Sequence, residues 1–273
     1  MSWLALFASQ LFFLPIGPTR DVAVDAQGRL RSGRLPYSLM RLCVLAVSIV
    51  LCSLLTNSCS KAITRATAAT VFSVKGEVTF GSAERNDFQP VTLKSRIHDG
   101  DSVRAANGAS VDLGLIPGAF AQLSGDSELK VEELRITKDG NETAGDMRER
   151  RARIRVIRGK LIVLFIPSDT NASGFVITAP GVTVKPDSDC LFSVWTDGTA
   201  TRITCAKEKV IASADEQPPV TIAVGYFQRW PRVWNEPVVA ASDASAQIDI
   251  TESLQAGDRL LGQASSWQKR RPF

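Results

Sequence analysis

From Val71 onward, hydrophobic and polar residues alternate with a period of two, which is the pattern of half-buried β-strands. The segment from Val71 to Phe80 predicts one strand with Gly76 at its middle. Further short apolar runs follow at steady intervals, separated by turn signals such as Asn107-Gly108 and Pro117-Gly118. The pattern predicts an all-β fold, a single domain of short strands arranged as a β-roll, a solenoid-like stack or a sandwich.

The strand predicted at residues 151–156 carries arginines on one face, Arg151, Arg153 and Arg155, and apolar residues on the other. Two interpretations stay open. The arginines bind an anionic partner, such as a lipid headgroup, a glycan or an acidic protein, or they form a solvated face paired with glutamates of a neighbouring strand. The next run, residues 161–166, is apolar at every position and predicts a central strand covered on both faces.

A hairpin is predicted around Asp197-Gly198, a strong turn signal between two alternating strands. Pairing residues outward from this turn places Cys190 directly opposite Cys205. Because an exported chain folds in a compartment that permits disulfides, we expect a cross-strand disulfide between the two. Two buried free thiols are the alternative.

The C-terminal part begins with an aromatic cluster, Tyr226, Phe227, Trp230 and Trp234, which either binds a glycan or partner or closes one end of the β-domain. Residues 231–273 are rich in Ala, Ser and Asp, and they predict a mobile tail with a short helix around residues 250–261.

The N-terminal part predicts export. An apolar stretch over residues 42–55 follows Met40-Arg41 and ends shortly before Cys59, the order of a bacterial signal peptide. We therefore interpret residues 1–39 as a disordered N-terminal extension, 40–58 as the signal peptide, 59–70 as a tether and 71–230 as the β-domain. The start, Met1 or Met40, is left open.

Cys59 is the candidate lipidation site. Ser58 fits the small residue that precedes a lipoprotein cysteine, whereas Thr56 replaces the usual leucine. A diacylglyceride on Cys59 would hold the protein at a membrane of the periplasm or cell envelope. Two alternatives stay open: cleavage after Ala66-Thr67-Ala68, which releases the protein, and an uncleaved anchor, although the stretch is shorter than the ~20 residues of a typical span.

The composition argues against several kinds of functional site. The 32 basic and 28 acidic residues give a net charge of +4, too balanced to predict nucleic-acid binding. The single histidine, His98, argues against a multi-histidine metal site, and Asp187-Ser188-Asp189 lacks the ligand count of a calcium loop. No pairing of nucleophile and base stands out. We therefore expect no catalytic residues, no metal and no cofactor, and a protein that is not an enzyme.

The order of these motifs resembles the FecR-domain family, a periplasmic all-β module. Val74 to Val78 around Gly76, Gly100-Asp101-Ser102-Val103 and residues 111–123 resemble its first half. Gly159-Lys160, Phe175 to Pro180, Phe192-Ser193-Val194 and residues 203–210 resemble its second half. Two positions depart from the family pattern: Asp189-Cys190 replaces a Gly-Thr step, and Glu208 replaces a glycine.

The resemblance implies a periplasmic β-module. It does not carry over the sigma-regulating role of FecR proper, because residues 1–39 are too short for a sigma-binding domain. The resulting prediction is a non-enzymatic, membrane-tethered binding or scaffold module that recognises an envelope protein or glycan. The alternative is a FecR-type transmembrane signalling regulator linked to an extracytoplasmic sigma factor.

Overall fold

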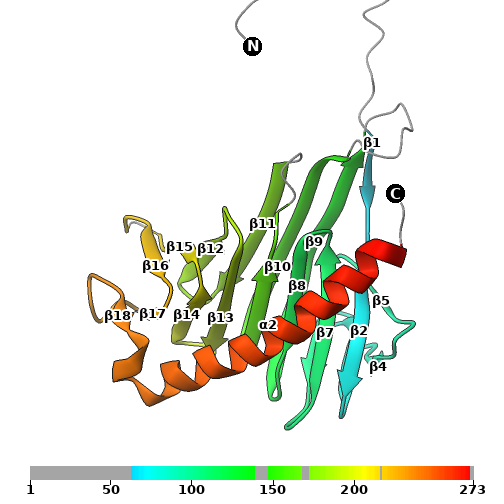
Figure 1. The fold of residues 1–273 in the computed structure, drawn as a ribbon. Coiled ribbons are helices and arrows are strands. Elements are labelled where there is room, and N and C mark those ends of the chain that lie inside the picture. Colours follow the sequence, from blue (N-terminus) through cyan, green and yellow to red (C-terminus); the bar gives the residue numbers. More distant parts are fainter. Residues whose placement is uncertain (1–62, 139–146, 168–171, 216, 271–273) are drawn as a thin grey trace, which may run out of the picture. The chain divides into compact units, whose positions relative to one another are not determined.

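The computed structural model describes residues 63–138, 147–167, 172–215 and 217–270, all of which belong to the second of two units, Ser60–Phe273. These residues form two β-sheets that share one long strand, β10 (Met147–Phe165) (Figure 1). The predicted all-β fold class is confirmed, and a single long helix is added to it.

The first sheet, sheet A, contains the N-terminal half of β10. Its strands, in spatial order, are β4 (Gln89–Pro90), β3 (Val78–Ser82), β6 (Asp101–Ala105), β9 (Ser127–Lys138), β10, β11 (Ala172–Ala179), β12 (Val182–Lys185), β15 (Lys209–Ser213) and β16 (Val220–Ala223). Strand β1 (Ile63–Ala66) pairs with the far end of β9, so part of the predicted tether is a strand.

The second sheet, sheet B, contains the C-terminal half of β10. Its strands, in spatial order, are β5 (Arg96–Ile97), β2 (Ala69–Lys75), β7 (Ser110–Ile116), β8 (Ala119–Leu123), β10, β13 (Cys190–Thr196), β14 (Thr201–Lys207), β17 (Tyr226–Trp230) and β18 (Val238–Val239).

The core lies between the sheets, because one buried cluster takes residues from both. Phe165 of sheet B stacks on Phe175 of sheet A, with ring centroids 5.6 Å apart. Strand β10 changes sheets at Gly159, whose φ of 84° favours glycine. A Cβ there would lie 2.5 Å from the Cα of Ser127, so the crossing also requires the missing side chain.

The strand predicted from Val71 to Phe80 is in fact two strands. Residues up to Lys75 belong to sheet B, and residues from Val78 belong to sheet A. Gly76 has a φ of 74°, outside the extended region, so the chain turns there and continues in the other sheet.

The largest difference from the sequence prediction is at the C-terminus. After the short helix η1 (Ala240–Ser242), helix α2 (Ala244–Arg270) runs across the outer face of sheet B (Figure 1). Its buried side chains include Ala256, Leu260 and Ala264, which pack on apolar residues of β8, β10 and β13. The prediction of a mobile tail with one short helix is therefore wrong for these residues.

Close packing of α2 depends on small residues. A Cβ at Gly257 would lie 2.7 Å from Cδ2 of Leu191, which is fully buried beneath the helix. Polar contacts fix the same helix at both ends: Asp249 bonds to Lys160 and Arg202 of sheet B, and Gln263 donates to Asp112. Sheet B is therefore covered on both faces, by sheet A and by α2.

Candidate functional site

The outer face of sheet A carries a continuous line of polar side chains across six strands. Each member lies directly opposite the next in the strand register. We call this line the polar row, and its members are Ser102 (β6), Lys130 (β9), Arg155 (β10), Thr178 (β11), Thr183 (β12) and Ser213 (β15).

The alternating sequence of each strand explains why these side chains share one face. In β10, Arg155 is exposed while its neighbours Ile154 and Val156 are fully buried in the core. In β9, Leu129 and Val131 are buried on either side of Lys130. Since side chains along a strand alternate between faces, burying the apolar residues puts the polar ones on the outer surface.

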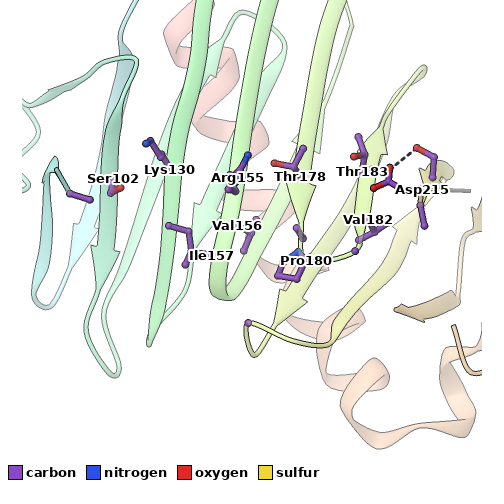
Figure 2. Close-up of a pocket in the computed structure, with 16 residues that line it drawn as sticks. Ser102, Lys130, Arg155, Val156, Ile157, Thr178, Pro180, Val182, Thr183 and Asp215 are labelled. Atoms are coloured by element: carbon purple, nitrogen blue, oxygen red, sulfur yellow. Dashed lines mark hydrogen bonds between the residues drawn. The ribbon is translucent and has the colours of Figure 1, made fainter. Parts of the chain in front are cut away.

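A groove of about 670 Å³ follows the polar row. Figure 2 shows Lys130, Arg155, Thr178 and Thr183 projecting from neighbouring strands along it. On its other side lie the partly exposed Ile157 and Pro180, with Val156 and Val182 buried beneath the surface. The groove therefore combines two cations and several hydroxyl groups with a small apolar surface, and Asp215 also lines it.

The two cations of the row each lie near a carboxylate, at different distances. The Arg155 Nε lies 2.6 Å from Glu132 Oε1. The Lys130 Nζ lies 3.7 Å from Oε1 of Glu84, whose side chain is almost fully exposed. Because one partner of each pair is largely exposed, Arg155 in the first and Glu84 in the second, the pairs contribute little and are screened by salt, and both cations remain able to bind an incoming anion.

Ser102 lies at one end of the row, and its hydroxyl group is buried. Its side chain is fully buried, and its Oγ has no hydrogen-bond partner in the described structure. Buried polar groups nearly always have a partner, and leaving one unpaired costs about 1–3 kcal/mol. Ser102 also lines the groove, so its hydroxyl is placed to bond a group that enters there.

The predicted arginine ladder is correct as a pattern, since Arg151, Arg153 and Arg155 are exposed and the alternate residues are buried. Arg151 bonds to Glu149 at 2.6 Å, and this hydrogen bond raises the pKa of Arg151. Within the described residues, Arg153 makes no ion pair. Glu149 lies on the same strand as Arg151, so among the described residues only Arg155, with Glu132 of β9, shows the expected pairing with a glutamate of a neighbouring strand; only Arg155 lines the groove.

The predicted register of the cysteine hairpin is wrong. Thr196 pairs with Thr201, so the loop has four residues instead of two, and Phe192 lies opposite Cys205. A register shift between Leu191 and Phe192 moves Cys190 further from direct opposition. Both cysteines are buried as free thiols, and burial raises both pKa values, that of Cys205 to about 11. The expected disulfide is not formed.

Two other groups of predicted residues are placed as follows. In the aromatic cluster, Phe227 and Trp230 are buried, whereas Tyr226 and Trp234 are partly exposed, and Trp234 meets Phe227 edge-on.

Cys59 and residues 1–58 lie outside the described residues. Within the described ranges, no helix is long and apolar enough to cross a membrane, and no cluster of three or more His, Cys, Asp or Glu side chains is suited to a metal.

Sequence reasoning missed five members of the polar row. Ser102 lies in the Gly100-Asp101-Ser102-Val103 motif of the family resemblance, and nothing in the sequence around Lys130, Thr178, Thr183 and Ser213 marks them as site residues. Each is an ordinary polar position of an alternating strand. Only the pairing of strands distant in sequence brings them together, as with Lys130 and Arg155.

Comparison with known proteins adds little. No protein-family model matches the chain, and no curated protein matches it. Among solved structures, two crystal structures of a "putative anti-sigma factor" from Parabacteroides distasonis match, at 11% and 13% identity and TM-scores of 0.35 and 0.36. Each match covers 50% of this chain and 57% of the other, so this chain spans little more than half of that protein. Likeness at this level carries no functional argument.

Proposed function

We propose that this protein is a non-enzymatic binding module of the bacterial cell envelope that holds an anionic partner in the groove of sheet A. The observation that carries the proposal is the polar row itself. Lys130 and Arg155 lie opposite each other as its second and third members, with one hydroxyl group on one side and three on the other.

The groups in the row are suited to holding a ligand. Lysine, arginine and hydroxyl side chains donate hydrogen bonds, and two adjacent cations attract negative charge. The unpaired Ser102 hydroxyl adds a donor that an anion or an oxygen of the ligand would satisfy. The row offers no nucleophile hydrogen-bonded to a base, so binding, and not a reaction, is its proposed role.

Attachment through a lipid on Cys59 completes the proposal. Strand β1 begins four residues after Cys59 and pairs with β9 from Ile63 to Ala66. Processing at Cys59 would leave this pairing intact, whereas cleavage after Ala68 would delete β1 from sheet A. This supports the lipoprotein over the released form.

Two experiments test the proposal. Metabolic labelling with a fatty acid is expected to mark the wild-type protein and not the Cys59→Ala variant; label on that variant removes the lipid tether. Purified protein is expected to bind immobilised dextran sulfate and to elute at lower salt when Lys130 and Arg155 are both changed to Gln. Equal elution of Arg153→Gln and wild type is the control. Equal elution of the double variant would remove the groove as the site.

The FecR resemblance of residues 71–230 is compatible with this proposal and with its alternative, a FecR-type signalling regulator. Such a regulator would keep residues 1–39 and place them in the cytoplasm. The N-terminus of the mature protein distinguishes the two. Retention of residues 1–39 would favour the regulator, and loss of residues 1–58 would favour the tethered module.

A further inference from the structure

We infer that the anionic partner is an acidic glycan, whose sugar units lie along the polar row and whose acid group sits between Lys130 and Arg155. This inference rests on the proposed function and deepens it by naming the ligand class. The acid group is a carboxylate or a phosphate, since both accept bonds from the same pair of cations.

The geometry of the row fits an extended chain that crosses the strands. Neighbouring strands lie about 4.8 Å apart, so the five steps from Ser102 to Ser213 cover roughly 24 Å. One step is close to the length of a sugar unit in an extended polysaccharide. A linear glycan can therefore present one unit to each strand.

The order of groups along the row also fits a sugar acid. Positive charge is confined to the second and third of the six members, Lys130 and Arg155. Hydroxyl groups lie beyond them on both sides, Ser102 at one end and Thr178, Thr183 and Ser213 at the other. A ligand that matches this order presents an acid group to the two cations and sugar hydroxyl groups to the other members of the row.

The hydroxyl groups of the row are poorly used within the protein. The Ser102 Oγ has no hydrogen-bond partner among the described residues. Thr178 and Ser213 reach main-chain oxygens only at 3.4 Å, near the limit for a hydrogen bond. Such hydroxyls can turn toward the hydroxyls of a ligand with little loss of internal bonding.

An acidic peptide fits the groove less well. A peptide that adds as a strand needs an unpaired sheet edge, but β9, β10, β11 and β12 are paired on both sides. A peptide that binds through side chains needs deep apolar pockets for its anchors. The apolar residues of the groove, such as Val156 and Val182, are instead buried beneath its surface.

A membrane surface also fits less well. Insertion into lipid requires exposed apolar side chains beside the cations. Among the described residues, the large exposed hydrophobic side chains are Leu93, Val224, Tyr226, Val233, Trp234, Val239, Ile248, Leu254 and Leu261. None of them lines the groove.

The test is a titration calorimetry experiment on the purified mature protein with defined probes. The probes are a short oligogalacturonate, its methyl-esterified neutral form, a phosphorylated oligomannoside, poly-L-glutamate, and vesicles of phosphatidylcholine with phosphatidylglycerol. The variants are the double change of Lys130 and Arg155 to Gln, the double change of Thr178 and Thr183 to Val, and Arg153→Gln as a control that removes one positive charge outside the groove.

The inference predicts that oligogalacturonate or the phosphorylated oligomannoside binds and that the neutral form does not. Removing both cations is expected to weaken binding at least about tenfold, as expected for lost charge-assisted bonds. Removing both threonine hydroxyls is expected to weaken it about threefold or more. Arg153→Gln is expected to bind like wild type. Preference between the two acidic probes identifies the acid group.

Other outcomes distinguish failure of the glycan inference from failure of the proposed function. If poly-L-glutamate binds as well as the acidic sugars and the threonine variant is unaffected, the groove binds anions but the glycan inference is wrong. If vesicles bind and soluble sugars do not, the glycan inference is likewise wrong. If no anionic probe binds, or if binding does not depend on Lys130 and Arg155, both the glycan inference and the proposed function are wrong.

Discussion

The two outer faces of the sandwich carry ion pairs of nearly identical length in opposite surroundings. On sheet A, Arg155 lies 2.6 Å from Glu132, and the two side chains are 59% and 20% exposed. On sheet B, Arg202 lies 2.7 Å from Asp249 beneath helix α2, and the two side chains are 9% and 1% exposed. Distance is therefore not what distinguishes them.

Burial gives these pairs different roles. Charges beneath α2 have lost their water, so each depends on its partner, and removing one leaves the others unsolvated. Charges on sheet A keep their water and lose little when a partner leaves. The helix-covered face is built for stability, whereas the open face can exchange an internal partner for a ligand.

We expect the largest effect from Asp249→Ala, which removes the buried carboxylate of the helix-covered face. The change leaves Arg202 without its carboxylate, and Lys160 keeps only Glu252 at 2.6 Å. Breaking a buried pair on one side costs about 3–5 kcal/mol, so the free energy of unfolding should fall by about that amount. Urea denaturation of the purified protein measures it.

The control for this variant is Asp258→Ala, which removes a carboxylate from the exposed side of the same helix. Surface changes away from special features usually stay within about 0.5 kcal/mol. If the two variants lost equal stability, the buried charges beneath α2 would not be what fixes the helix.

A second test compares neighbouring leucines of α2. Leu260 is fully buried against sheet B, whereas Leu261 is 47% exposed. Leu260→Ala is expected to lower the free energy of unfolding by about 3 kcal/mol, through lost burial and the cavity it leaves. Leu261→Ala should cost less than about 1 kcal/mol. A mobile helix would make the two denaturation curves coincide.

A third test concerns the start of α2. Asp243 caps the helix by accepting a 2.9 Å bond from the Ala246 N–H, and it pairs with Arg229 at 2.6 Å. The bond from Ala246 in the first place, and the charge of Arg229 in addition, lower the pKa of Asp243. Asp243→Ala should cost about 1 kcal/mol at neutral pH.

The pH dependence of this variant follows from the lowered pKa. A carboxylate whose pKa is lower in the folded state stabilises the protein above its unfolded pKa of about 3.9. That contribution disappears as the pH falls through the folded value, so wild type and Asp243→Ala should converge in strong acid. Asp243→Asn keeps an acceptor for the cap but loses the charge, and it should fall between them. A difference that stays constant down to acid pH would contradict the charged cap.

The sequence predicted which faces of a strand are buried where the pattern is local to that strand. Alternation in residues 151–156 gave the correct faces of β10, and the apolar run at 161–166 correctly indicated a strand covered on both sides. It could not show what covers the second face. Helix α2 lacks a strong apolar stripe because its contact positions are small or polar, among them Ser253, Gly257 and Asp249.

Long-range pairing explains the remaining differences. Asp249 at a buried position is stable only because Lys160 and Arg202 lie opposite it, and neither is near in sequence. The cysteine register depended on loop length and on a bulge near Leu191, which the turn signal does not specify. Glu208, where the resemblance implies a glycine, adopts a φ of 59°, a left-handed conformation that favours glycine.

The smallest expected effect comes from the open face. Arg155→Gln breaks a 2.6 Å ion pair, yet the free energy of unfolding should change by less than about 1 kcal/mol, because water replaces the lost partner on both sides. A double-mutant cycle with Glu132→Gln in urea measures the coupling, which should shrink further in 0.5 M NaCl. If Arg155→Gln were instead as damaging as Asp249→Ala, Arg155 would be tied to the fold and unable to serve an anion in the groove. A small coupling is thus the condition on which binding at the polar row depends.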